Sequence, residues 1–289
     1  MCLEMIKNAL YVSDLDGTLL TNRAVLSDFS KQTLQQLLQD GLVFTVASAR
    51  SVVPMQVILE GLKLPLPIVE FNGAFITDLA TGYHEIINHI EPSIIEDLYP
   101  LIQRFNCVPI VSTFNGSEDC LYYKDIINAG MNWYVENRRS SQDRRLRAIA
   151  NLTDSFRDRV VCLTMINQAA VLTELDLAIK ATYGSRVETQ FYENRYAPGW
   201  HWLTVHDRRA TKAQAIQLLR EYYGFGNSEL VVFGDHNNDI TMFQIAERAI
   251  AVENATTELK GYATHLIDSN EEDSVVKYIY QDVKRLQFS

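Results

Sequence analysis

The sequence has few cysteines and no excess of basic residues, and both absences exclude classes of protein. It contains four cysteines in 289 residues, at positions Cys2, Cys107, Cys120 and Cys162. None forms a C-x-x-C pair and no histidine stands at zinc-finger spacing, so we expect buried thiols and no structural zinc site. Lys and Arg number 26 against 36 Asp and Glu, a formal net charge of -10. Because nucleic-acid binders need a basic face, we expect no nucleic-acid partner.

Long apolar runs are also missing. No stretch approaches the roughly 18 uncharged apolar residues that a membrane span requires. Residues 1–7 carry an early acid and lack the apolar segment of a signal peptide. We therefore expect a cytoplasmic protein without a membrane partner. Its length and its 47% hydrophobic residues allow one large domain or two modest ones.

The N-terminal segment alternates between apolar runs and amphipathic segments. Short runs rich in strand formers occur at residues 9–13, 42–47 and 68–71. Between them, an apolar face capped by Ser27 predicts one helix, and residues 52–62 predict a second. Strand, helix, strand, helix, strand at this spacing is typical of a parallel α/β sheet.

The C-terminal third shows the same alternation of expected strands and helices. Together the two ends predict an α/β fold with a Rossmann-like parallel sheet as its core. The expected C-terminal elements are a helix at 211–223, a strand at 229–233, a helix at 239–247, a strand at 249–252, a helix capped by Asn254, a strand at 265–267 and a helix at 274–286.

The middle of the chain is less regular and richer in aromatic residues and arginine. We predict that residues 87–202 form an α/β cap domain inserted into a core made of residues 1–86 and 203–289, because domain termini often lie close together. The cap is where we expect substrate choice to be made. Its arginine-rich stretch Arg138–Arg147 has two interpretations, a solvated helix face or a contact with a second anionic group of the substrate.

Polar residues gather at or just after the expected strand ends. Asp14 and Asp16 follow the first strand, although a D-x-D pair arises by chance about once in a chain of this composition. Ser48 ends the second strand, and the segment 234–239 (GDHNND) follows a later one. Lys212 begins a helix and offers a fixed positive charge. Since ligands of open α/β sheets bind at the carboxyl ends of strands, we expect these groups to form one site.

A site of this composition favours a hard cation and a phosphoryl group. Several carboxylates at neighbouring strand ends would repel one another unless a cation lay among them. Oxygen ligands with room for water and phosphate suit Mg²⁺. A carboxylate beside that metal can attack phosphorus in line. The sequence therefore predicts a magnesium-dependent phosphoryl-transfer enzyme.

The four segments, in this order, resemble the haloacid dehalogenase-like (HAD) superfamily, and most closely its Cof-type phosphatases with a type IIB cap. D-x-D-G-T-L followed by G-D-x-x-N-D carries most of the resemblance, together with Phe71–Ala74 and Asn254-Ala255. The match covers both halves of the core, while the middle resembles the family only in position and length. Ala49 and Ser274 stand where the family often has glycine, and neither change removes a functional atom.

The resemblance implies roles for the acids. Asp14 would be the nucleophile that forms an aspartyl-phosphate, and Asp16 the general acid that then acts as base. Asp14, the backbone carbonyl of Asp16 and Asp235 would hold Mg²⁺, and Asp239 would support that metal shell.

The resemblance also implies how the phosphoryl group is held. Ser48 and Lys212 would bind its oxygens as part of the catalytic set, with Asn238 near the phosphate. The expected partner is a small phosphorylated metabolite, with sugar phosphates as the leading class. The expected reaction is hydrolysis of a phosphomonoester.

Other functions share parts of this pattern. A receiver domain is shorter and needs neither an inserted domain nor Asp16, and a P-type ATPase has lysine in place of that second acid and needs membrane helices. A phosphomutase on the same core, and a regulatory HAD protein without catalysis, remain the alternatives. A silent regulator is disfavoured because every polar group of the motifs is present.

Overall fold

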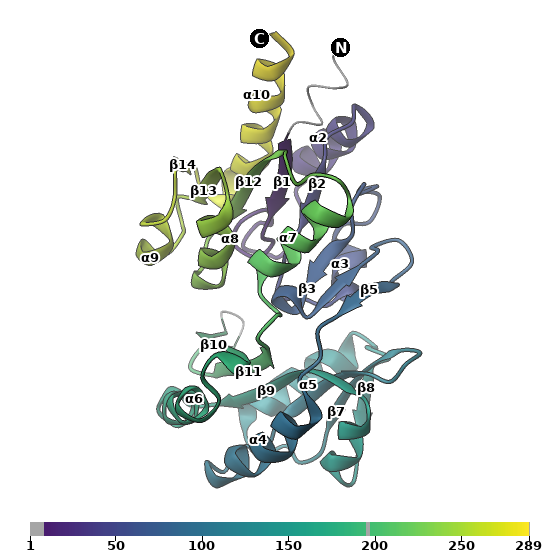
Figure 1. Cartoon of the computed structure of the whole chain (residues 1–289), viewed down its shortest axis with the longest axis vertical. Coiled ribbons are helices and arrows are strands. Elements are labelled where there is room, and N and C mark those ends of the chain that lie inside the picture. The colour runs from purple at the N-terminus through teal and green to yellow at the C-terminus, as the bar shows by residue number, and fades with distance from the viewer. Residues whose placement is uncertain (1–8, 195–196, 289) are drawn as a thin grey trace. The chain divides into compact units, whose positions relative to one another are not determined.

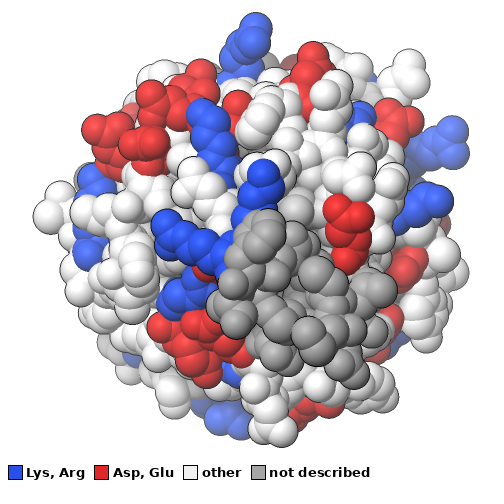
Figure 2. All heavy atoms as spheres, turned by 90° about the horizontal axis from the view of Figure 1, so that it is seen from above, with Lys and Arg blue, Asp and Glu red and all other residues white. Residues whose placement is uncertain are grey.

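The computed structural model describes residues 9–194 and 197–288 (Figure 1). Cys2 and the predicted absence of a signal peptide at residues 1–7 fall outside this range. The chain divides into two compact units, one formed by Met1–Ile86 with Ala210–Ser289 and the other by Ile87–Arg209. Every described helix is too short or too polar to cross a lipid bilayer. On the face drawn in Figure 2, basic and acidic side chains lie interspersed.

The first unit is built on a five-stranded parallel sheet, which confirms the predicted α/β fold. The strand order is β14-β13-β12-β1-β2, and each of the neighbouring pairs is parallel. Because the strands are parallel, the residues that follow β1, β2 and β12 emerge at the same edge. The strands are β1 (Ala9–Ser13), β2 (Phe44–Val46), β12 (Glu229–Gly234), β13 (Arg248–Val252) and β14 (His265–Ile267).

The helices of this unit begin largely where the sequence predicts. Ser27 caps the first of them and accepts a hydrogen bond from the backbone of Ser30, and Thr211 caps α7 in the same way. The last short helix is capped by Thr256, so the prediction that Asn254 caps it is wrong. The helices are α2 (Asp28–Gln39), α3 (Val52–Ile58), α7 (Lys212–Tyr222), α8 (Ile240–Ile245), α9 (Thr257–Lys260) and α10 (Ser274–Phe288).

The third predicted strand does not join the parallel sheet as a full member. β3 (Ile68–Glu70) pairs antiparallel with β4 (Phe75–Thr77) in a separate sheet, which β5 (His84–Ile87) completes. A single parallel bridge, between Ala47 and Val69, connects it with the strand before it. The reason is local, because the chain turns back immediately after Glu70.

The second unit is a six-stranded sheet with helices on both faces. Its strand order is β10-β11-β9-β6-β7-β8. α4 (Pro92–Arg104) and α6 (Ala169–Tyr183) pack on one face, and α5 (Ala129–Ser140) packs on the other. The strands are β6 (Ile110–Phe114), β7 (Asp119–Tyr123), β8 (Leu146–Ala148), β9 (Arg159–Asn167), β10 (Val187–Glu193) and β11 (His201–Asp207).

Two details of this unit differ from the predictions. β11 pairs with β9 and β10, so the unit extends to Arg209 instead of ending at residue 202. The stretch Arg138–Arg147 is not one helix face, because α5 ends at Ser140. Beyond it, Arg145 pairs with Asp143 and Arg147 pairs with Glu118, each at 2.7 Å.

Candidate active site

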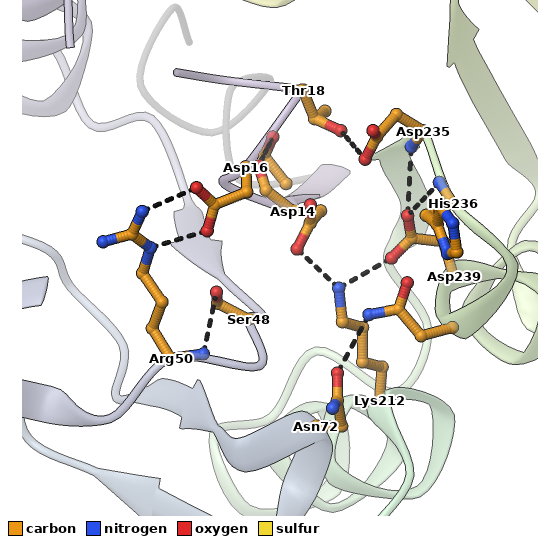
Figure 3. Close-up of polar contacts among 12 residues, drawn as sticks. Asp14, Asp16, Thr18, Ser48, Arg50, Asn72, Lys212, Asp235, His236 and Asp239 are labelled. Atoms are coloured by element: carbon orange, nitrogen blue, oxygen red, sulfur yellow. Dashed lines mark hydrogen bonds and ion pairs between the residues drawn. The ribbon is translucent and has the colours of Figure 1, made fainter. Parts of the chain in front are cut away.

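The predicted site residues meet at the carboxyl edge of the parallel sheet (Figure 3). Asp14 follows β1 directly, Ser48 lies just beyond β2, and Asp235 follows β12. All three are buried, with between 1% and 6% of their surface exposed. Burial of this many polar groups at one edge is the pattern of a functional site, since ordinary polar turns are solvated.

Lys212 lies at the centre of this group. Its Nζ donates to Asp14 Oδ1 and to Asp239 Oδ1, each at 2.6 Å, and its side chain is fully buried. Burial by itself lowers the pKa of Lys212, but the two carboxylates outweigh that effect and raise it above its usual value. The ammonium therefore stays charged and fixes one oxygen of Asp14.

Asp239 is engaged on both of its oxygens. Oδ2 accepts hydrogen bonds from the backbone N–H groups of Asp235 and His236, at 3.0 and 3.1 Å. Gly234 allows this approach, because a Cβ there would lie 2.6 Å from Asp239 Oδ2. The loop after β12 is thus folded around Asp239. This carboxylate binds the ammonium of Lys212 and the backbone N–H of Asp235, and so fixes the positions of both residues.

Gly234→Ala is expected to destabilise the protein by about 1–3 kcal/mol, because the added methyl overpacks the buried Asp239 carboxylate. Urea unfolding measures this loss. Gly226→Ala is the matched control, since a Cβ at Gly226 has nothing within 4 Å, and its effect should stay within about 0.5 kcal/mol. Equal stability of the two variants would show that the close approach does not matter.

Three carboxylates can share a cation here. Oxygens of Asp14, Asp235 and Asp239 lie within 4.8 Å of one another, and all three residues are buried. Burial raises the pKa of Asp14 well above its usual value, Lys212 opposes the shift, and the charges of Asp239 and Asp235 add to it. Three buried acids against one ammonium leave an excess of negative charge, and their hard oxygen atoms fit a divalent cation such as Mg²⁺.

Asp16 lies apart from that group and pairs with Arg50. Nε and Nη2 of Arg50 donate to the two carboxylate oxygens of Asp16, each at 2.6 Å. The pair is partly exposed, so the Asp16 carboxylate is open to solvent. The sequence motifs predict no role for Arg50. Its spacing two residues after Ser48 was the available signal.

The two other predicted phosphate-binding groups, besides Lys212, are also present at this edge. Ser48 Oγ accepts a hydrogen bond from the backbone N–H of Arg50 at 3.2 Å. Asn238 Nδ2 donates to Asn72 Oδ1 at 3.0 Å. The hydroxyl of Thr18 donates to Asp235 Oδ1 at 3.1 Å and connects the D-x-D segment with the segment 234–239.

Asn254, predicted as a helix cap, contacts the loop that follows the nucleophile. Its Nδ2 donates to the carbonyl of Gly17 at 2.7 Å, and its Oδ1 accepts from the backbone of Asn270 at 3.0 Å. Asn270 in turn donates to the carbonyl of Leu20 at 2.8 Å. The two asparagines therefore hold both ends of the segment 17–20.

Comparison with known proteins identifies the family of the chain. The family model for haloacid dehalogenase-like hydrolases matches residues 11–279. The chain belongs to this family. The predicted resemblance is therefore confirmed over both units of the hydrolase.

Relatives of known name are phosphatases of almost the same length. The 5-amino-6-(5-phospho-D-ribitylamino)uracil phosphatase of Bacillus subtilis is 24% identical over 278 residues, which are 94% of this chain and 97% of the relative. The pyridoxal phosphate phosphatase of Escherichia coli is 24% identical over 282 residues, covering 92% and 96%. The prediction that the chain is an enzyme of the phosphatase class is confirmed by the family and by these relatives.

Solved structures share the fold. A haloacid dehalogenase-like hydrolase from Bacteroides thetaiotaomicron superposes with a TM-score of 0.75 at 20% identity, over 95% of this chain and 99% of that one. A protein from Thermotoga maritima gives a TM-score of 0.75 at 23% identity, over 94% and 96%. These likenesses support the arrangement of the sheets and helices.

Proposed function

We propose that this HAD hydrolase is a Mg²⁺-dependent phosphomonoesterase whose nucleophile is Asp14. The observation that carries the proposal is the buried Asp14 carboxylate, held by Lys212 at 2.6 Å and grouped with two further acids at the sheet edge. Asp14 and Asp235 would hold the ion together with the backbone carbonyl of Asp16, and Asp239 would support them. The bound ion would offset the negative charge of the acids and of the phosphoryl oxygens.

In the first step, Asp14 forms a bond to phosphorus as the bond from phosphorus to the leaving oxygen breaks. Lys212 engages one oxygen of Asp14, so the other oxygen is the attacking atom in this proposal. Asp16 gives its proton to the leaving oxygen, which departs as an alcohol. Because both oxygens of Asp16 accept from Arg50 in the structure, at least one of those bonds must be exchanged for this transfer.

In the second step, Asp16 takes a proton from water, and the water oxygen attacks phosphorus. The bond between phosphorus and Asp14 then breaks, releasing inorganic phosphate and the free carboxylate. Ser48 and Asn238 would bind phosphoryl oxygens throughout, beside the Lys212 ammonium.

The proposed substrates are small phosphorylated metabolites, with sugar phosphates as the first class. The name of the Bacillus relative includes a phosphorylated ribityl chain, which is a sugar-alcohol phosphate and supports this class. Pyridoxal phosphate, named for the Escherichia relative, is a further candidate. We propose the unit Ile87–Arg209 as the cap that selects among them.

Phosphate release from a panel of metabolites with Mg²⁺ tests the proposal. The panel should contain sugar phosphates, a ribityl phosphate, pyridoxal phosphate and para-nitrophenyl phosphate. We expect release from at least one sugar phosphate. Absence of release from every compound would overturn the phosphatase assignment, and activity only with a bisphosphate activator would indicate a mutase.

Removal of the metal should abolish turnover reversibly. A chelator is expected to lower phosphate release at least about 100-fold, because the buried acids then keep their uncompensated charge, and added Mg²⁺ should restore it. Asp235→Asn is expected to raise the Mg²⁺ concentration for half-maximal activity at least about 10-fold. Asp268→Asn, at an exposed acid of the same unit, is the control. Full activity in the presence of chelator would contradict the metal proposal.

A further inference from the structure

Three consecutive residues after β3 adopt left-handed backbone conformations. Phe71, Asn72 and Gly73 have φ values of 44°, 56° and 114°, and we call them the left-handed turn. Two of the three are not glycine, and Asn72 is only 2% exposed. Residues other than glycine rarely adopt such a φ. Where they do, they cluster at functional sites, and surrounding contacts maintain the conformation.

The backbone of the left-handed turn holds the segment that carries Ser48. The N–H of Asn72 donates to the carbonyl of Ser48 at 2.9 Å. The N–H of Phe71 donates to the carbonyl of Arg50 at 3.1 Å. These two bonds fix the chain from Ser48, the residue that we propose as a phosphate ligand, to Arg50, the residue that pairs with Asp16.

The side chain of the central residue, Asn72, reaches the segment 234–239. Asn72 Oδ1 accepts the hydrogen bond from Asn238 Nδ2 at 3.0 Å. The left-handed backbone lets a single residue bind Ser48 through its N–H and Asn238 through its side chain. Asparagine tolerates this conformation better than most residues, which accounts for its presence here.

Gly73 lies directly against the start of α7. A Cβ at this position would lie 2.5 Å from the carbonyl oxygen of Thr211 and 2.8 Å from its nitrogen. Thr211 is the N-cap of the helix, and Lys212 is its first residue. Only a residue without a side chain permits this separation, so Gly73 determines how closely the Lys212 segment approaches the turn.

We propose that the left-handed turn is a positioning element that sets Ser48, Lys212 and Asn238 relative to one another. The three groups come from three distant segments of the chain, and the turn contacts all three segments. This inference rests on the proposed function, because it concerns how the phosphate ligands are arranged. Asn72 and Gly73 are positioning residues, since they act through Ser48, Asn238 and Lys212.

Gly73→Ala is the first test. The methyl must displace Thr211, and a displacement of about 1 Å at reacting groups can lower turnover about 100-fold. We expect a loss of that size in kcat/KM with the best substrate of the panel. Gly116→Ala is the matched control, because Gly116 has a similar φ of 103° but a Cβ there would have nothing within 4 Å. It carries the same backbone strain and should keep full activity.

Asn72→Gly is the second test, because glycine keeps the left-handed backbone and removes only the carboxamide. We expect the inhibition constant for inorganic phosphate to rise about 10-fold, since Asn238 loses its partner. Asn128→Gly is the control. Asn128 also donates one amide hydrogen bond, at 2.8 Å to the carbonyl of Ile166, but lies in the second unit. If Asn72 has only a structural role, both variants should lose stability, and neither should change its inhibition constant for inorganic phosphate.

The outcomes separate this inference from the proposed function. Binding of inorganic phosphate with Mg²⁺, measured by titration calorimetry, is compared between each variant and its control and needs no turnover. If the wild-type chain binds phosphate but hydrolyses nothing, the proposed function is wrong. The comparison of phosphate affinities between variants and controls still tests the positioning proposal. If Gly73→Ala and Asn72→Gly bind phosphate as tightly as Gly116→Ala and Asn128→Gly, the positioning proposal is wrong. Should Gly73→Ala fail to fold, the Asn72→Gly comparison decides.

Discussion

Asp14→Asn is expected to lower phosphate release by at least about 10⁴-fold, since an amide cannot take the place of an attacking carboxylate. The change is nearly isosteric, and it leaves Lys212 with one charged partner, Asp239, at 2.6 Å. The variant should therefore fold. Steady-state phosphate release gives the loss, and mass spectrometry of the quenched wild-type reaction should detect a phosphorylated peptide that contains residue 14.

A suitable control for this variant is Asp282→Asn. Asp282 accepts from the hydroxyl of Tyr11 at 2.7 Å and pairs with Arg248 at 2.7 Å, but it lies on α10 and carries no proposed catalytic role. It should lose stability and keep its kcat. Turnover by Asp14→Asn at the level of Asp282→Asn would show that Asp14 is not the nucleophile.

Much of the core could be predicted from the sequence because its signals are local. The strands 9–13 and 265–267 have the predicted bounds, since each is a short apolar run bounded by polar residues. Ser27 could be predicted as a cap because its side chain accepts from the backbone N–H of Ser30, within one helical turn. The strand at 68–70 joins a different sheet from the predicted one, because the chain turns back after Glu70 and the strand pairs antiparallel with β4. An apolar run indicates a strand but not its pairing partner.

In the candidate site too, the sequence predicts which residues gather but not which side chains pair. Motif spacing indicated which residues gather at the sheet edge, because parallel strands bring their carboxyl ends together. It did not indicate that Arg50 pairs with Asp16, or that Asn72 pairs with Asn238, since each contact joins side chains from distant segments. Such contacts are set by tertiary packing, and residue periodicity contains no information about them.

Lys212→Met is expected to reduce both stability and activity, for two separate physical reasons. The substitution keeps the apolar stem and removes the charge, so Asp14 and Asp239 remain buried without their cation. Breaking a buried pair in this way costs about 3–5 kcal/mol, which urea unfolding without Mg²⁺ should detect. Bound Mg²⁺ should recover part of this loss, because it offsets the charge of the same acids.

The expected loss in kcat/KM is about 1,000-fold, and Mg²⁺ should not recover it, since the ion does not replace the bond that orients Asp14. Lys212→Arg should not restore activity either, because a planar guanidinium does not fit a fully buried ammonium site. Lys180→Met is the control, since Lys180 is 57% exposed and its bond to Asp176 joins residues one helical turn apart, a pair that contributes about 0.3–0.5 kcal/mol. If Lys212→Met loses stability but keeps the activity of Lys180→Met, the ion pair with Asp14 supports folding alone, and another group must orient the nucleophile.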